Sequence, residues 1–274
     1  GWRKNIQQNK QILIIMMVLL LAIFAAAVFG ESLPGDSDEV LSGSFIRGQI
    51  AWLLLLPLLM AIPSIARELA LSISSLKKKI VKRGRKGSSN KWRTAGAHMV
   101  HLGLLLLLLG HVFTTTLIDR GDASHRQTLV KDEAKIIGDE AFIFREVIVI
   151  SDEDPEFDER FLVGDGYIGV RIDIHEVVDG EVGDLLTTLE PGVLRFDSPN
   201  GRTTARSEIS RHSSLYGDLV VIFDSSQASG LMSASFMAQL DDVNSVRVTI
   251  QDLNGSHFVW LGWGMMLLGL LAGS

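Results

Sequence analysis

The chain has 274 residues, a formal net charge of −6, no cysteine, and 47% hydrophobic residues. The lack of cysteine excludes disulfide bonds, zinc–thiolate sites and thiol redox chemistry within this chain, so any redox role needs a cofactor. The hydrophobic residues are concentrated in long runs, which excludes an ordinary soluble domain and predicts a membrane protein.

Four apolar runs predict transmembrane helices, because about 20 apolar residues span the hydrocarbon core of a bilayer. The runs cover residues 12–29, 46–65, 95–117 and 257–274. The second run contains Pro57 and Pro63, which a membrane helix tolerates when its neighbours satisfy the freed carbonyl groups. The basic start and the last run, which stops at the end of the sequence, lead us to expect a piece of a longer protein.

Charge predicts the orientation of these helices. Residues 77–93 contain nine Lys or Arg and no acid, whereas residues 31–44 contain four acids and no base. By the positive-inside rule, the N-terminus and the basic loop 67–94 are cytoplasmic, and residues 118–256 lie outside the plasma (inner) membrane. Leu69, Ile73, Leu76 and Ile80 share one helical face, which favours an interfacial helix on lipid headgroups. The basic run lacks interleaved aromatics, so we expect no nucleic-acid binding.

The outer segment 118–256 is predicted to be one β domain. Ile168, Val170, Ile172 and Ile174 alternate with polar residues or glycine, and Val246, Val248 and Ile250 do the same. This pattern predicts an antiparallel sandwich or barrel with six to eight strands. We expect 151–159 and 225–238 to be loops. The segment carries 27 acids and 12 Lys or Arg, giving a charge of about −15.

The third apolar run carries His98, His101 and His111. Ionisable groups at membrane depth are costly and usually face a partner or a cavity, and neutral imidazole is a common ligand of haem iron. His101 and His111 are about 15 Å apart along a helix, so they cannot ligate the same iron. His98 is most simply an interfacial residue. For His111, a hydrogen bond to a Ser or Thr of another helix is favoured over a ligand role. For His101, haem ligation and structural packing are equally supported, and the following Leu102-Gly103 leaves room for a macrocycle.

The remaining histidines are predicted to be surface residues or interfacial anchors. His175 is placed on the polar face of a strand, His125 and His212 in exposed segments, and His257 at the membrane interface. The outer domain has no nucleophile elbow, phosphate loop or zinc motif, which gives no support for catalysis by this domain.

An ordered set of motifs resembles the C-terminal half of CcmF, the haem lyase family of system I cytochrome c maturation. The helix opening at 96–103 reads Gly-Ala-His-Met-Val-His-Leu-Gly. It is followed by Leu189-Glu190-Pro191 with Arg195-Phe196, by Glu208-Ile209, by Asp218-Leu219-Val220, and by a closing helix with Val259-Trp260-Leu261-Gly262. Val220 stands where that family usually has tyrosine.

The resemblance implies that His101 is an axial ligand of a membrane-embedded haem b. It also implies that the tryptophan-rich haem motif and the second ligand lie in an N-terminal half or a partner subunit. Further implied partners are a haem chaperone, apocytochrome c, its thiol-handling chaperone and membrane lipid. Such a chain is expected to be a subunit or fragment of a cytochrome c synthase, inactive alone.

Two alternatives remain open. The plan of three helices, an outer β domain and a fourth helix is also similar to the ResB-type subunit of system II cytochrome c synthases. From another class, the chain could be a cofactor-free, membrane-anchored interaction module whose helix histidines only pack.

Overall fold

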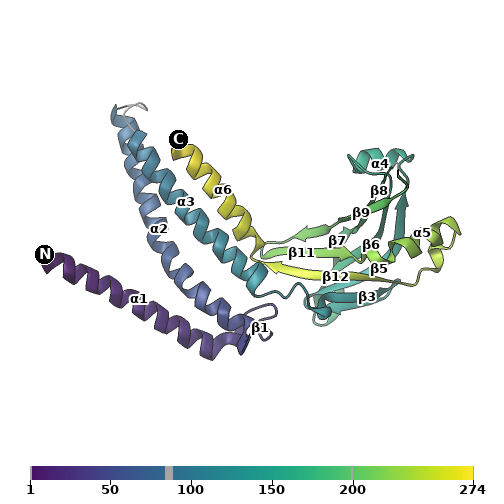
Figure 1. The fold of residues 1–274 in the computed structure, drawn as a ribbon, viewed down its shortest axis with the longest axis horizontal. Helices are drawn as coiled ribbons and strands as arrows, with labels where there is room; N and C mark the ends of the chain where they lie inside the picture. Colours follow the sequence, from purple (N-terminus) through teal and green to yellow (C-terminus); the bar gives the residue numbers. More distant parts are fainter. Residues whose placement is uncertain (1, 84–88, 199, 274) are drawn as a thin grey trace. The chain divides into compact units, whose positions relative to one another are not determined.

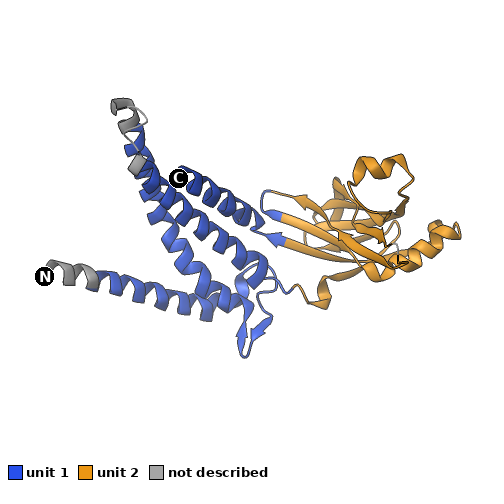
Figure 2. Cartoon of the chain, turned by 45° about the horizontal axis from the view of Figure 1, so that its top comes forward, with its two compact units in different colours: residues 1–119, 215–217, 253–274 blue, residues 120–214, 218–252 orange. Residues whose placement is uncertain are grey.

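The structure is a computed structural model that describes residues 2–83, 89–198 and 200–273. The chain divides into two compact units, coloured blue and orange in Figure 2. We call residues 1–119, 215–217 and 253–274 the helical unit, and residues 120–214 and 218–252 the β unit. The predicted fold class, a membrane protein with a helical bundle and an antiparallel β domain, is confirmed.

Four long helices build the helical unit in the residues that the structure describes (Figure 1). They are α1 (Trp2–Phe29), α2 (Arg47–Arg83), α3 (Ser89–His111) and α6 (Ser256–Gly273). Within the described residues, four spans are long and apolar enough to cross a membrane: 9–32, 47–77, 91–116 and 256–273. The short element η1 (Gly30–Ser32) and the hairpin β1 (Val40–Ser42) and β2 (Phe45–Ile46) connect α1 to α2.

The helix α2 is longer than the sequence predicts. Residues 67–83, expected in the basic loop, continue it without interruption past Pro57 and Pro63. Leu55, Ile62, Leu69 and Leu76 recur every seventh residue, and all four are buried or partly buried. This single apolar stripe explains why one long helix forms instead of a separate interfacial helix. The basic residues Arg85 and Lys86 lie outside the described residues.

The helices α3 and α6 lie side by side and are joined by a seam of glycines (Figure 1). A methyl group added at Gly96 would lie 2.5 Å from the carbonyl oxygen of Gly269. At Gly103 it would lie 2.7 Å from the carbonyl oxygen of Gly262. Small residues let helix backbones approach closely in a membrane, where lipid supplies no hydrophobic drive for association. Glycine is therefore required at these contacts.

The β unit contains two antiparallel sheets that share one core. One has the order β10-β11-β12-β3, and the other β4-β5-β6-β8-β9 with β7 paired to β6. Buried residues of both, among them Leu129, Phe144, Ile172 and Val248, form the core of a sandwich. The strands are β3 (Arg126–Val130), β4 (Ala134–Ile137), β5 (Glu140–Ile150), β6 (Tyr167–Val178), β7 (Glu181–Leu189), β8 (Gly192–Asp197), β9 (Thr203–Glu208), β10 (Ser210–Ser213), β11 (Gly217–Phe223) and β12 (Ser245–Asn254).

The alternation predicted for two strands is confirmed. Ile168, Val170, Ile172 and Ile174 of β6 are all buried, as are the three apolar residues of β12 named above. The strand count was wrong: β3 to β12 make ten strands in the described residues, because short strands such as β4 and β10 carry no readable alternation. Both expected loops also contain helices, α4 (Pro155–Arg160) and α5 (Ala228–Phe236).

Capping explains one of these missed helices. Asp154 accepts a hydrogen bond from the backbone N–H of Glu156, and Pro155 occupies the first turn of α4. Aspartate at the N-cap followed by proline is a helix start signal that high net charge had obscured. The helix α5 is preceded by the 3-10 turn η5 (Ser225–Gln227), which Asp224 caps in the same way.

Candidate functional site

The helix α3 has one exposed face, and two of the three candidate histidines lie on it. His101, Leu104, Leu108 and His111 are all exposed and follow one another at spacings of three and four residues. Ala97 and Thr115 extend the same spacing in both directions. This is the a/d pattern of a helix that packs against another helix. We call these six residues the exposed stripe of α3.

The exposed stripe lies opposite the glycine seam. Gly103 is two positions after His101, which corresponds to a rotation of about 200° around the helix axis. Because Gly103 is buried against Gly262 of α6, the imidazole of His101 points away from α6. The expectation that Gly103 makes room for a macrocycle beside His101 is therefore wrong, since that room is filled by the backbone of α6.

The imidazoles of His101 and His111 form no hydrogen bond or ion pair with any described residue. Both lie within the span 91–116. Their separation of ten residues, about 15 Å along the axis, puts them at two different depths of this span. His98 is half-buried and lies within about 20° of Leu109, on the side of α3 that packs against α2. The fold thus places His101 and His111 on one face and His98 on another.

A short π-helical segment, η3 (Val112–Thr116), follows His111. The hydroxyl of Thr114 donates to the carbonyl oxygen of Gly110 at 3.0 Å, and that of Thr115 donates to the carbonyl oxygen of His111 at 2.5 Å. Ser and Thr hydroxyls that bond to the preceding turn compete with the regular helix ladder and distort it. The run Thr114-Thr115-Thr116 was the sequence signal for this distortion.

The end of this segment is held by Arg47 at the start of α2. Its Nη1 donates to the carbonyl oxygens of Thr116 and Ile118 at 3.3 and 3.2 Å, and its Nη2 lies 3.0 Å from the Asp119 carboxylate. The last carbonyls of a helix lack partners within the helix, so a buried guanidinium is well suited to satisfy them. Arg47 therefore fixes the exit of α3, a role that the sequence did not reveal.

The remaining histidines do not cluster with one another. His175, expected to be solvated, is half-buried on β6, with its Nδ1 3.0 Å from the carbonyl oxygen of Gly183. His125 and His212 are partly exposed, and His257 is exposed at the start of α6.

The acidic and basic residues of the resembling motifs stabilise the β unit. Glu190 accepts hydrogen bonds from Arg160 at 2.5 Å and from Arg171 at 2.9 Å, and its backbone carbonyl accepts one from the Tyr167 hydroxyl at 2.8 Å. Arg195 pairs with Asp197 at 3.1 Å, and buried Asp218 accepts from Ser213. The polar side chains of these motifs are thus paired within the β unit.

Comparisons with known proteins find a structural similarity. No protein-family model and no curated protein sequence matches the chain. Among solved structures, the chain is similar to the cytochrome c heme lyase CcmF, with a TM-score of 0.47 and 21% sequence identity. The match covers 94% of this chain and 34% of that one, so this chain spans about a third of that protein. The chain is thus similar to part of CcmF, the family that its motifs resemble. At this TM-score and identity, the match assigns no activity and no residue role.

Proposed function

We propose that this chain is the part of a membrane haem lyase that contributes one axial ligand, His101, to a haem b, and that it acts in cytochrome c biogenesis. The observation that carries the proposal is the exposed imidazole of His101 inside a membrane span, without a partner in the described residues. An unpaired imidazole facing hydrocarbon would be costly, so this face must be covered by something that binds it.

The donor chemistry fits a haem. A neutral imidazole is the most common protein ligand of haem iron, and a ring that no other described group contacts has both nitrogens available. The neighbouring positions of the exposed stripe, Ala97 and Leu104, are small or apolar and suit a flat, apolar ring. Haem b bound there would supply electron transfer, which in the CcmF resemblance keeps the transferred haem iron reduced.

The second ligand is proposed to come from another polypeptide segment or a partner subunit. His111 lies too far along α3 to reach the same iron, and α2 and α6 cover the other sides of the helix. In the resemblance, that segment also carries the tryptophan-rich haem motif. The chain is accordingly proposed to work in a complex with it, with a haem chaperone and with apocytochrome c, in the plasma membrane with the β unit on the extracytoplasmic side.

The test is the visible spectrum of the protein purified with its membrane partners in mild detergent. We expect a b-type spectrum on reduction for the wild type and its loss, or a fall in haem content of at least about tenfold, in His101→Ala. His98→Ala is the matched control, because it removes an imidazole from a different face of the same helix. Its haem content should equal that of the wild type.

Other outcomes identify the alternatives. Haem that persists in His101→Ala and disappears in His111→Ala would contradict the assignment of His101. An intact complex without haem would contradict the haem proposal and favour the cofactor-free interaction module, for which the three- and four-residue spacing of the exposed stripe is suited. The ResB-type reading predicts co-purification with a different partner set.

A further inference from the structure

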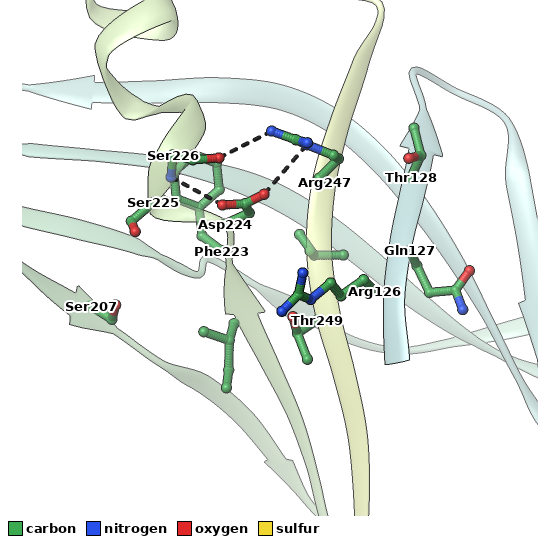
Figure 3. Close-up of a pocket in the computed structure, with 12 residues that line it drawn as sticks. Arg126, Gln127, Thr128, Ser207, Phe223, Asp224, Ser225, Ser226, Arg247 and Thr249 are labelled. Atoms are coloured by element: carbon green, nitrogen blue, oxygen red, sulfur yellow. Dashed lines mark hydrogen bonds and ion pairs between the residues drawn. The ribbon is translucent and has the colours of Figure 1, made fainter. Parts of the chain in front are cut away.

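The β unit contains a polar cavity of about 530 Å³ on the side of β11, β12 and β3 that faces away from the sandwich core (Figure 3). This volume is typical of small-molecule sites. Residues of four strands line it, including Ser207 of β9, and the turn after β11 closes one side with Asp224, Ser225 and Ser226. The cavity lies entirely within the β unit.

The register of two strands places two arginines in this cavity. Arg126 of β3 pairs with Thr249 of β12, and Thr128 of β3 pairs with Arg247 of β12. Side chains alternate along a strand, and Leu129, Val246 and Val248 point into the core, so these four polar residues share the opposite face. Figure 3 shows both guanidinium groups on this face, together with the two threonines.

The two arginines differ in their partners. Nη2 of Arg247 lies 3.0 Å from the hydroxyl of Ser226, and its Nε lies 3.4 Å from the carboxylate of Asp224. The Arg126 guanidinium forms no hydrogen bond or ion pair with any described residue, although it lines the same cavity. One guanidinium is thus neutralised by Asp224, and the other is left with all its donors available.

Asp224 remains ionised in this arrangement. A hydrogen bond from the Ser226 hydroxyl lowers the pKa of its carboxyl, and the positive charges of Arg247 and Arg126 lower it further. Its carboxylate also accepts the backbone N–H of Ser226 at 3.0 Å. Asp224 therefore holds Arg247 in place, while the guanidinium of Arg126 acts on this carboxylate only through space and keeps its hydrogen-bond donors available.

We propose that this cavity binds a small ligand through a carboxylate or phosphate group, with the Arg126 guanidinium as the main contact. The donors that line the cavity include the fork of Arg126 and the hydroxyls of Ser207, Ser225, Thr128 and Thr249. A guanidinium recognises planar oxyanions through two parallel hydrogen bonds, and neighbouring hydroxyls satisfy the remaining lone pairs. The site requires no haem and is independent of the proposed role of His101.

The experiment is calorimetric titration of the full chain in detergent with sodium succinate or inorganic phosphate, at constant ionic strength against chloride. The two probes distinguish a carboxylate from a phosphate site. We expect saturable binding of at least one probe, weakened at least about tenfold in Arg126→Gln, since one charge-assisted contact is lost. Asp224→Asn should strengthen binding, because it removes a competing carboxylate while the asparagine oxygen still caps η5.

Arg206→Gln is the matched control. Arg206 also belongs to the β unit, but it pairs with Glu208 and does not line the cavity. Its affinity should equal that of the wild type. The proposal is overturned if neither probe binds at millimolar concentration, or if Arg126→Gln binds as well as the wild type. It is also overturned if Arg206→Gln loses as much affinity as Arg126→Gln, because the effect would then be one of general surface charge. Binding that is unchanged or weaker in Asp224→Asn would also contradict it.

Discussion

At the start of β5, the carboxyl group of Glu140 is half-buried among other acids. Burial raises the pKa of Glu140, and the negative charges of Asp252 and Asp139 raise it further. A carboxyl whose pKa is higher in the folded protein than in the unfolded chain loses its proton at a higher pH in the folded protein. Its contribution to stability is therefore most favourable in acid and decreases as the pH rises above the unfolded pKa.

Replacing this residue gives a prediction with a definite sign. Glu140→Gln removes the buried charge, so the variant should unfold at a higher temperature than the wild type at pH 7, and the difference should vanish below pH 4.5, the ordinary pKa of the group. Thermal unfolding followed by circular dichroism across this pH range is the measurement. Glu181→Gln, at an exposed position of β7, should show no such pH-dependent gain. A Glu140→Gln variant that is less stable at pH 7 would contradict the argument.

At the element scale, α3 and α6 are held together by close backbone contact at glycines. Along the seam between α3 and α6, glycine meets glycine at Gly96–Gly269 and Gly103–Gly262, and the two contacts are seven positions apart on each helix. A seven-residue spacing keeps the contact on one side of two helices that cross at a small angle. The opposite side of α3 is the exposed stripe, so the seam also decides which histidines face outward.

Two glycines on α6 allow a matched test of the seam. A methyl group at Gly262 would lie 2.6 Å from the carbonyl oxygen of Gly103, whereas one at Gly264 would meet nothing within 4 Å. Both substitutions gain the same intrinsic helix propensity, so their difference isolates packing. Gly262→Ala should lose about 1–3 kcal/mol of stability in mild detergent, and Gly264→Ala should match or slightly exceed the wild type. Equal stability of the two variants would show that the seam is not a close contact.

Across the whole molecule, basic and acidic residues are concentrated in different segments of the chain. Nine bases lie in residues 77–93, and the segment 118–256 has 27 acids and 12 bases. The positive-inside rule therefore predicts that 77–93 and the β unit lie on opposite sides of the membrane. An acidic surface of this size would also speed the encounter with basic partners at low salt.

The absence of cysteine makes this orientation directly measurable. We expect Asp38→Cys and Glu181→Cys to react with a membrane-impermeant thiol reagent in intact cells, and Ser88→Cys to react only after lysis. The unsubstituted chain, which has no cysteine, is the blank. The reverse labelling pattern would contradict the predicted orientation, and labelling of all three variants in intact cells would do the same.

The sequence by itself determined the existence and type of the long elements. Four apolar runs predicted the four spans, because burial of about 20 apolar residues requires a helix in a bilayer. The alternation at residues 168–174 and 246–250 predicted strands with the observed inward faces. These patterns are local and periodic, so they can be read without knowing what lies beside them.

Only the tertiary structure decided what these elements face. Gly103 could equally have bordered a cofactor or a neighbouring helix, and the seam with Gly262 decided for the helix. Arg47 caps carbonyls about 70 positions further along the chain, and the positive charge of Arg126 acts on Asp224 only because β3 pairs with β12. Sequence periodicity fixes the direction of a side chain within its own element. The identity of the group it meets depends on long-range packing, which no local pattern encodes.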